Sequence, residues 1–253
     1  MTKAPLPFSD LAASDGHLDH TAFDDLLGRY VKADRSSVSW VDYTAWRASS
    51  ADRSALDDYL VVLQAVHPAS LTRDEQFAFW VNLYNAETLR VVLAHRPTRS
   101  ILFIRPTWLS LGPWSARRLT VDGVPLSLSD IENRILRPGF ADARVHYALN
   151  CASTGCPTLR PRAWVALNLD AELDAAARAM INRPDHVRIK NGKVVLSRIF
   201  KWYRQDFGQT DAEVIDHIAT YADDVLKDEI ARHGQIAGYQ YDWSLNGNGK
   251  GPD

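Results

Sequence analysis

Apolar side chains recur every three or four positions in two stretches near the start of the chain, residues 20–32 and 51–66. They are Phe23, Leu26, Leu27 and Tyr30 in the first stretch, and Leu56, Leu60 and Leu63 in the second. This period puts the apolar positions on one face of a helix, so both stretches are predicted to be amphipathic helices. A third stretch, residues 73–95, is apolar almost all round, which is typical of a buried helix. Thr72 and Glu75 have capping-box form at its start, and Pro97 cannot continue it.

Beyond this helix the pattern changes to short alternating runs. Strands are predicted at residues 101–104, 117–121, 124–128 and 143–149. The pairs Asp122-Gly123 and Asn191-Gly192 accept positive φ and therefore predict hairpins, the second within residues 186–197. Further helices are predicted over residues 130–137, opened by a Ser129–Glu132 capping box, over 171–182, and from near Ser197, Asp211 and Asp223, before an extended piece at 239–246.

Helices and hairpins mix without a regular βαβ alternation, so the predicted class is α+β. We expect a helical N-terminal half packed on short antiparallel strands and hairpins. The 253 residues suit one domain, residues 1–253, because no linker-like stretch divides them.

Composition narrows the classes of partner. The chain has 29 basic and 31 acidic residues, a net charge of −2, so it lacks the basic surface that nucleic acid or an anionic membrane would need. No apolar run approaches the roughly 18 residues of a membrane-spanning helix, so no membrane insertion is expected. The expected partner is a small molecule or a peptide. The numbered residues carry no signal-peptide pattern, and two cysteines suit either redox setting.

The long helix carries an unusual polar stripe. Glu75, Asn82 and Asn85 are spaced by seven and three residues, which places them close to one line on the helix surface. Buried amides and carboxylates need hydrogen-bonding partners, so the stripe should meet either loop backbone or a ligand. In the first case Glu75 is only a capping acid; in the second, the stripe belongs to a site.

Both cysteines, Cys151 and Cys156, lie close after His146. A thiol at Cys151 could act as a nucleophile with His146 as its base, if the chain bends near Asn150. The cysteines could equally form a disulfide in an oxidising compartment. Zinc is disfavoured because the spacing lacks a short Cys-x2-Cys pair and supplies three ligands at most. These readings stay open on the residues alone.

A third group of residues is rich in aromatic side chains, which are expected in the core or in a cleft wall. It comprises Trp202, Tyr203, Phe207, Tyr241 and Trp243. Asp206 and Asp242 stand among them. Either acid could orient a histidine, pair with an arginine, or cap a turn, and turn capping is the commonest of the three.

Four segments together resemble the family known as domain of unknown function 547, found in bacteria and plants. They are residues 73–86, 144–159, 197–208 and 241–246, in that order, and the resemblance extends over roughly residues 20–246. It implies kinship without an activity, and it favours a periplasmic or secreted protein, because bacterial relatives are often exported. The motif positions match Glu75, Trp80, Asn82, Asn85, His146, Cys151, Cys156, Trp202, Asp206, Asp242 and Trp243.

The leading hypothesis is a cysteine-dependent hydrolase or acyltransferase acting on an amide or thioester, with a papain- or transglutaminase-like core as one expectation. Cys151 would attack the carbonyl and His146 would carry the proton. Asn82, Asn85 or backbone amides would stabilise the oxyanion, and Glu75 or Asp242 would orient the imidazole.

The alternative is a non-catalytic ligand- or peptide-binding module with a structural Cys151–Cys156 disulfide. A third hypothesis is a hydrolase that uses carboxylates or a metal held by His146 and Glu75. Under the two main hypotheses no cofactor or metal is predicted.

Overall fold

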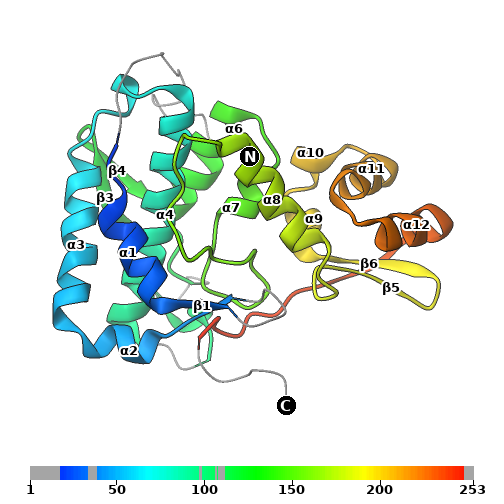
Figure 1. Ribbon diagram of the computed structural model, residues 1–253, viewed down its shortest axis with the longest axis horizontal. Helices are drawn as coiled ribbons and strands as arrows, with labels where there is room; N and C mark the ends of the chain where they lie inside the picture. The colour runs from blue at the N-terminus through cyan, green and yellow to red at the C-terminus, as the bar shows by residue number, and fades with distance from the viewer. Residues whose placement is uncertain (1–17, 34–38, 97–98, 106, 108–111, 248–253) are drawn as a thin grey trace.

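The computed structural model describes residues 18–33, 39–96, 99–105, 107 and 112–247, and within them the chain has the predicted α+β class. Helices α1 to α4 occupy one side of the molecule and β5, β6 and α9 to α12 the other, with α7 and α8 between them (Figure 1). The long helices are α1 (Thr21–Tyr30), α3 (Ser50–Gln64), α4 (Arg73–His95), α8 (Leu169–Ile181), α11 (Asp211–Tyr221) and α12 (Asp224–His233). Short helices are α2 (Tyr43–Ala48), α5 (Leu128–Asp130), α6 (Arg137–Phe140), α7 (Val145–Ala148), α9 (Arg198–Trp202) and α10 (Arg204–Phe207).

The predicted helices of the N-terminal half are confirmed. α4 begins where expected because the Thr72 side chain accepts a hydrogen bond from the backbone N–H of Glu75. It ends at His95, followed by Arg96 in the left-handed region at φ 50°. Pro97, the predicted stop, lies outside the described residues. α4 is buried from Glu75 to Leu89, and α1, α2 and α3 pack around it to form the larger hydrophobic core.

The strands of the described residues form three small sheets. β1 (Val31–Ala33) pairs with β2 (Ser39–Val41), and β3 (Arg117–Val121) with β4 (Val124–Ser127), both antiparallel. The hairpin β5 (Val187–Lys190) and β6 (Lys193–Ser197) turns at Asn191-Gly192, as predicted, with both residues at positive φ. The extended piece predicted at residues 239–246 overlaps β7 (Ile236–Gln240) at Tyr239 and Gln240, and β7 joins β6 in parallel.

Two predicted strands are wrong. Residues 101–104 were expected to be extended, but Ile101–Phe103 forms a 3-10 turn whose start is capped by the hydroxyl of Ser100. Residues 143–149 form the helical turn α7 instead of a strand, and Val145, His146, Tyr147 and Ala148 are all buried. The alternation of polar and apolar residues there did not mark two faces, because His146 is buried and Arg144 is half-buried, each with a specific partner.

The helix predicted over residues 130–137 exists, but it starts earlier. Ser127 and Asp130 make the reciprocal capping box, not Ser129 and Glu132. α5 leads directly into a π-helical segment, η4 (Ile131–Leu136), and then into α6. Glu132 is thereby left without a capping role, on a wider turn of a kind that is often found at functional sites.

A second hydrophobic core joins α8, the β5–β6 hairpin and the C-terminal helices. The predicted helices near Ser197, Asp211 and Asp223 are confirmed as α9, α11 and α12, each capped by a side chain. The chain then returns toward the N-terminal side, where Leu245 pairs with Ser153 and Gly247 with Val41 (Figure 1). None of the helices in the described part of the chain has the length and apolarity to cross a bilayer.

Candidate functional site

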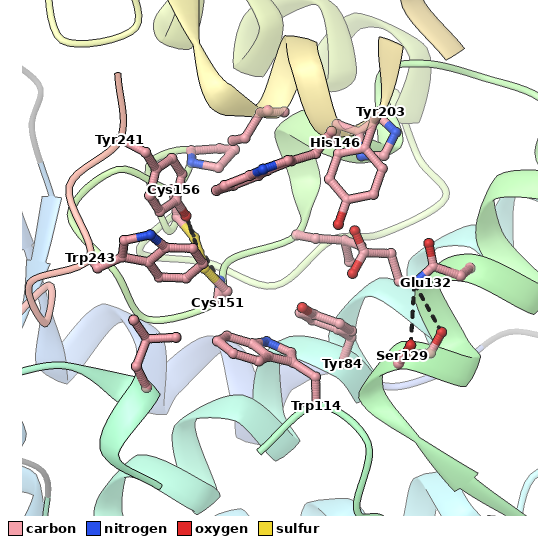
Figure 2. A pocket seen from close by; sticks show the side chains of 16 residues that line it. Tyr84, Trp114, Ser129, Glu132, His146, Cys151, Cys156, Tyr203, Tyr241 and Trp243 are labelled. Atoms are coloured by element: carbon pink, nitrogen blue, oxygen red, sulfur yellow. Dashed lines mark hydrogen bonds between the residues drawn. A yellow bond between two sulfur atoms is a disulfide. The ribbon is translucent and has the colours of Figure 1, made fainter. Parts of the chain in front are cut away.

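A cavity of about 440 Å³ opens between the larger core and the second core. Six aromatic side chains line it: Tyr84, Trp114, Trp202, Tyr203, Tyr241 and Trp243. Polar groups from Ser129, Glu132, Asn133 and His146 also face it, and Cys151 and Cys156 complete part of its wall (Figure 2). We call this space the aromatic cavity. Its walls come from α4, the η4 turn, α7, α9 and the C-terminal segment, so distant parts of the sequence must meet to form it.

One end of the cavity is built from packed aromatic rings. The Trp243 ring lies 4.6 Å from that of Tyr241, 5.5 Å from that of Trp202 and 5.9 Å from that of Trp114, between ring centroids. The rings meet at angles between 38° and 62°, so each leaves part of a face or edge open to the cavity. Trp202 is 43% exposed, which makes this end accessible from solvent.

The two cysteines form a disulfide in the cavity wall. Neither sulfur is therefore a thiol in this state, and both accept hydrogen bonds from neighbouring hydroxyls. Cys151 Sγ lies 3.0 Å from Ser153 Oγ and 3.2 Å from the Tyr241 hydroxyl, which is also 3.2 Å from Cys156 Sγ. Burial raises the pKa of Tyr241, whose hydroxyl therefore stays protonated and able to donate.

The disulfide loop is held against the C-terminal segment. The backbone N–H groups of Thr154 and Gly155 donate to the carbonyls of Ser244 and Asp242 at 2.8 and 2.9 Å. A Cβ at Gly155 would lie 2.8 Å from the backbone nitrogen of Asp242, so only glycine permits this close approach. This contact fixes Tyr241 and Trp243 beside the disulfide.

The opposite end of the cavity carries a buried acid. Glu132, on the η4 turn, is 8% exposed. Figure 2 shows its carboxylate between the ring of Tyr203 on one side and those of Tyr84 and Trp114 on the other. Burial, and secondarily the nearby Glu132 carboxylate, which accepts a hydrogen bond from the Tyr203 hydroxyl, raise the pKa of Tyr203.

His146 lies beside Tyr203, away from the disulfide in the view of Figure 2. Its ring stacks on that of Tyr203 with 4.1 Å between centroids, and its Nε2 donates to Asp206 Oδ2 at 2.6 Å. Asp206 also accepts two hydrogen bonds from the guanidinium of Arg137, at 2.5 and 2.9 Å. Burial raises the pKa of Asp206, but the bonds from His146 and Arg137 outweigh it and lower the pKa to about 2.

Asn82 and Asn85 tie loops to α4 instead of facing the cavity. The Asn82 amide donates to the carbonyl of Trp164 at 2.8 Å and accepts from its N–H at 3.0 Å. The Asn85 amide donates to the carbonyl of Ala148 at 3.0 Å and accepts from the N–H of Asn150 at 2.9 Å. Both amides are thus engaged with loop backbone, which is the structural alternative that the sequence left open.

The remaining two predicted site residues also lie away from the cavity lining. Glu75 is buried near His20, where its charge raises the pKa of that imidazole against the larger, lowering effect of burial. Asp242 caps a turn, because its Oδ1 accepts from the backbone N–H of Ser244 at 2.8 Å. Of the predicted set, His146 and Cys151 are the two that line the aromatic cavity.

Sequence reasoning did not select Glu132 or Tyr203 for a site, and it left Asp206 with three roles open. Asp206 performs two of them, since it orients His146 and pairs with Arg137. Glu132 was assigned to a capping box that lies two residues after the observed one. The signal that could have found it is the pair Ser127 and Asp130, which has the same capping spacing and leaves Glu132 unexplained.

In the described part of the chain, no group of three or more His, Cys, Asp or Glu side chains has the arrangement of a metal site. The third hypothesis joined His146 to Glu75. In the structure the hydrogen bond of His146 goes to Asp206, and Glu75 lies near His20.

The fold and the cavity define an α+β protein with an aromatic cavity that has a disulfide in its wall. Residues 68–181 match the family described as "Protein of unknown function, DUF547". This match supports the assignment to that family, and two of the four motifs, residues 73–86 and 144–159, lie within it. The match includes Glu132, His146 and both cysteines, while Trp202, Tyr203, Tyr241 and Trp243 lie beyond it. No curated protein and no solved structure matches the chain, so the papain- or transglutaminase-like core stays a prediction.

Proposed function

We propose that this protein is a ligand-binding module whose aromatic cavity takes a small molecule or a peptide side chain. The observation that carries this proposal is the convergence of six aromatic side chains and a few polar groups on one cavity of about 440 Å³. Binding sites for small molecules typically have this size and this mixture of apolar walls with few polar groups. The disulfide supports the same reading because it fixes the wall without supplying a nucleophile.

The experiment is a ligand-observed NMR screen with soluble aromatic and heteroaromatic fragments on the oxidised protein. Trp243→Ala removes a ring that contacts three others, so it should abolish the saturable binding of cavity ligands. Leu167→Ala is the matched control, because Leu167 is 76% exposed and does not line the cavity. Binding that survives Trp243→Ala for every fragment would contradict the proposal.

A cysteine-dependent hydrolase or acyltransferase is the second candidate, and it is favoured by one observation. Cys151 is half-buried in the wall of the same cavity that His146 lines. In this mechanism a dithiol would first reduce the disulfide, releasing Cys151 as the nucleophile. Asp206, which contacts His146, would orient the imidazole in place of Glu75 or Asp242. Backbone amides would form the oxyanion hole, since Asn82 and Asn85 are engaged elsewhere.

Reduction separates the two candidates. A hydrolase should cleave thioester and anilide substrates only after reduction, and Cys151→Ser should remove that activity while Cys156→Ser retains it. A binding module should take its ligand in the oxidised state and show no rate that depends on Cys151. Equal hydrolysis by the reduced protein and by Cys151→Ser eliminates the hydrolase. The disulfide also supports the expected periplasmic or secreted location, because such bonds persist in oxidising compartments.

A further inference from the structure

The lining of the aromatic cavity has an uneven charge. Among the sixteen described residues that line it, Glu132 is the acid and His146 the imidazole, and none is a lysine or an arginine. An anionic ligand would thus meet a carboxylate at the polar end and no cationic side chain to offset it. The lining therefore disfavours anions and favours neutral or cationic ligands.

The arginines near Glu132 are committed to other acids. The guanidinium of Arg137 donates two hydrogen bonds to the Asp206 carboxylate, and Arg134 forms an ion pair with Asp130 at 3.1 Å. Within the described ranges, none of the ion pairs joins Glu132 to an arginine, lysine or histidine. Glu132 is 8% exposed, and its carboxylate accepts a hydrogen bond from the Tyr203 hydroxyl and interacts with the charge of Arg137, whose direct ion pair is with Asp206. A cationic group entering the cavity would give Glu132 a direct ion pair of its own.

The rings around Glu132 are suited to such a cation. Tyr203 lies on one side of the carboxylate, and Tyr84 and Trp114 lie on the other (Figure 2). The faces of these rings are electron-rich and attract alkylammonium groups through cation–π interactions. Burial first, and then the charge of Glu132, raise the pKa of Tyr84, so its hydroxyl is neutral at physiological pH and adds no charge to the lining.

We propose that the aromatic cavity binds an organic cation, an ammonium group on an apolar body, with the ammonium beside Glu132 and the body against Trp202 and Trp243. This inference rests on the proposed ligand-binding function and specifies its ligand class. The apolar body is expected because the end away from Glu132 is lined by packed rings and the disulfide. An alkylated ammonium suits the cavity better than a strongly hydrated primary one, since the aromatic lining cannot replace a full hydration shell.

The test compares two probes of the same shape, the phenyltrimethylammonium ion and tert-butylbenzene, which differ by one charge. Affinities are measured by NMR titration on the oxidised protein, using the indole N–H signals of Trp114, Trp202 and Trp243 to locate the bound probe. We expect the cation to bind about tenfold more tightly than the neutral isostere. Glu132→Gln should remove this preference, so that the cation and tert-butylbenzene bind the variant with similar affinity.

Glu229→Gln is the matched control, because it removes one negative charge from α12, at the far edge of the fold (Figure 1). It should retain the preference for the cation. If tert-butylbenzene binds as tightly as the cation, the cavity is a binding site but the cation inference is wrong. If neither probe shifts the three indole signals, the binding-module proposal fails as well. Should Glu132→Gln not fold, the comparison of the two probes on the unsubstituted protein still decides the matter.

Discussion

Two sets of buried polar side chains lie within one molecule, and they do different work. On α4, the amides of Asn82 and Asn85 each donate to one backbone carbonyl and accept from one backbone N–H. Around the aromatic cavity, Glu132 and His146 bond to other side chains, Tyr203 and Asp206, and still line open space. The first set joins loops to a helix. The second set presents polar groups to whatever enters the cavity.

Buried polarity alone therefore does not identify a site. Every buried polar group needs a partner, so a polar stripe on an apolar helix predicts only that a partner exists. The partner decides the role, since an amide that bonds to loop backbone through both its NH2 group and its oxygen is held in place as a link between the loop and the helix. Substitutions in the two sets should therefore differ in their effect on stability.

Asn85→Ala should have the largest effect on stability. The substitution leaves the carbonyl of Ala148 and the N–H of Asn150 buried without their partner. Two such groups cost about 3–4 kcal/mol in the free energy of unfolding. Urea denaturation followed by circular dichroism measures it, with Gln205→Ala on the exposed side of α10 as the control. A loss below about 1 kcal/mol would show that water replaces the amide.

Opening the disulfide should come next. The bond closes a short loop between positions five residues apart, and loop entropy then predicts a stabilisation of about 2 kcal/mol. Cys151→Ser combined with Cys156→Ser should lower the free energy of unfolding by that amount and weaken ligand binding, because Tyr241 packs on both sulfurs. The unsubstituted protein under reducing conditions should behave like the double variant. If neither the double variant nor the reduced protein loses stability, the disulfide does not stabilise the fold.

Asp206→Asn should have a smaller effect that depends on pH. The Asp206 pKa is about 2 in the folded chain and about 4 in an unfolded one, so its stabilisation is complete above about pH 4. It is lost as the pH falls toward 2. We expect the variant to be less stable by roughly 1.5 kcal/mol at pH 7, allowing for partial exposure, with a difference that shrinks below pH 4. Denaturation curves at several pH values test this; a difference that grows on acidification contradicts it.

Glu132→Gln should have the smallest effect on stability. Glutamine keeps the shape and an acceptor for Tyr203 while removing a buried charge that no arginine or lysine of the described chain pairs with. The free energy of unfolding should therefore change by less than about 0.5 kcal/mol, or rise. Thermal denaturation provides the measurement. A large loss of stability would show that Glu132 has a structural role, like Asn82 and Asn85 of α4.

Much of the fold could be predicted from the sequence, because local chemistry determines it. The Thr72 cap, the Asn191-Gly192 hairpin and the caps at Ser197 and Asp223 all lie where the residue types predict them. The errors come from places where local pattern and tertiary contact disagree. The alternating pattern around His146 predicts a strand. In the structure His146 lies on the helical turn α7, and the rings of Tyr203 and Phe207 pack against it.

Only part of the candidate site could be predicted. His146 and Cys151 were selected for their chemistry, and both line the cavity. Glu132 and Tyr203 were not selected, because their contact joins residues about seventy positions apart and leaves no local pattern in the sequence. The partners of Asn85 could not be predicted for the same reason, because they lie in a distant loop, at Ala148 and Asn150. Such pairings are set by topology, which single-sequence patterns do not encode.

The return of the C-terminal segment across the disulfide loop has a consequence for biosynthesis. A ribosome makes α4, η4 and both cysteines long before Tyr241 and Trp243, yet these two residues close the wall beside the disulfide. Until Tyr241 and Trp243 have been made, the contacts that they form beside Cys151 and Cys156 are missing. The wall of the aromatic cavity is therefore completed later in synthesis than the core around α4.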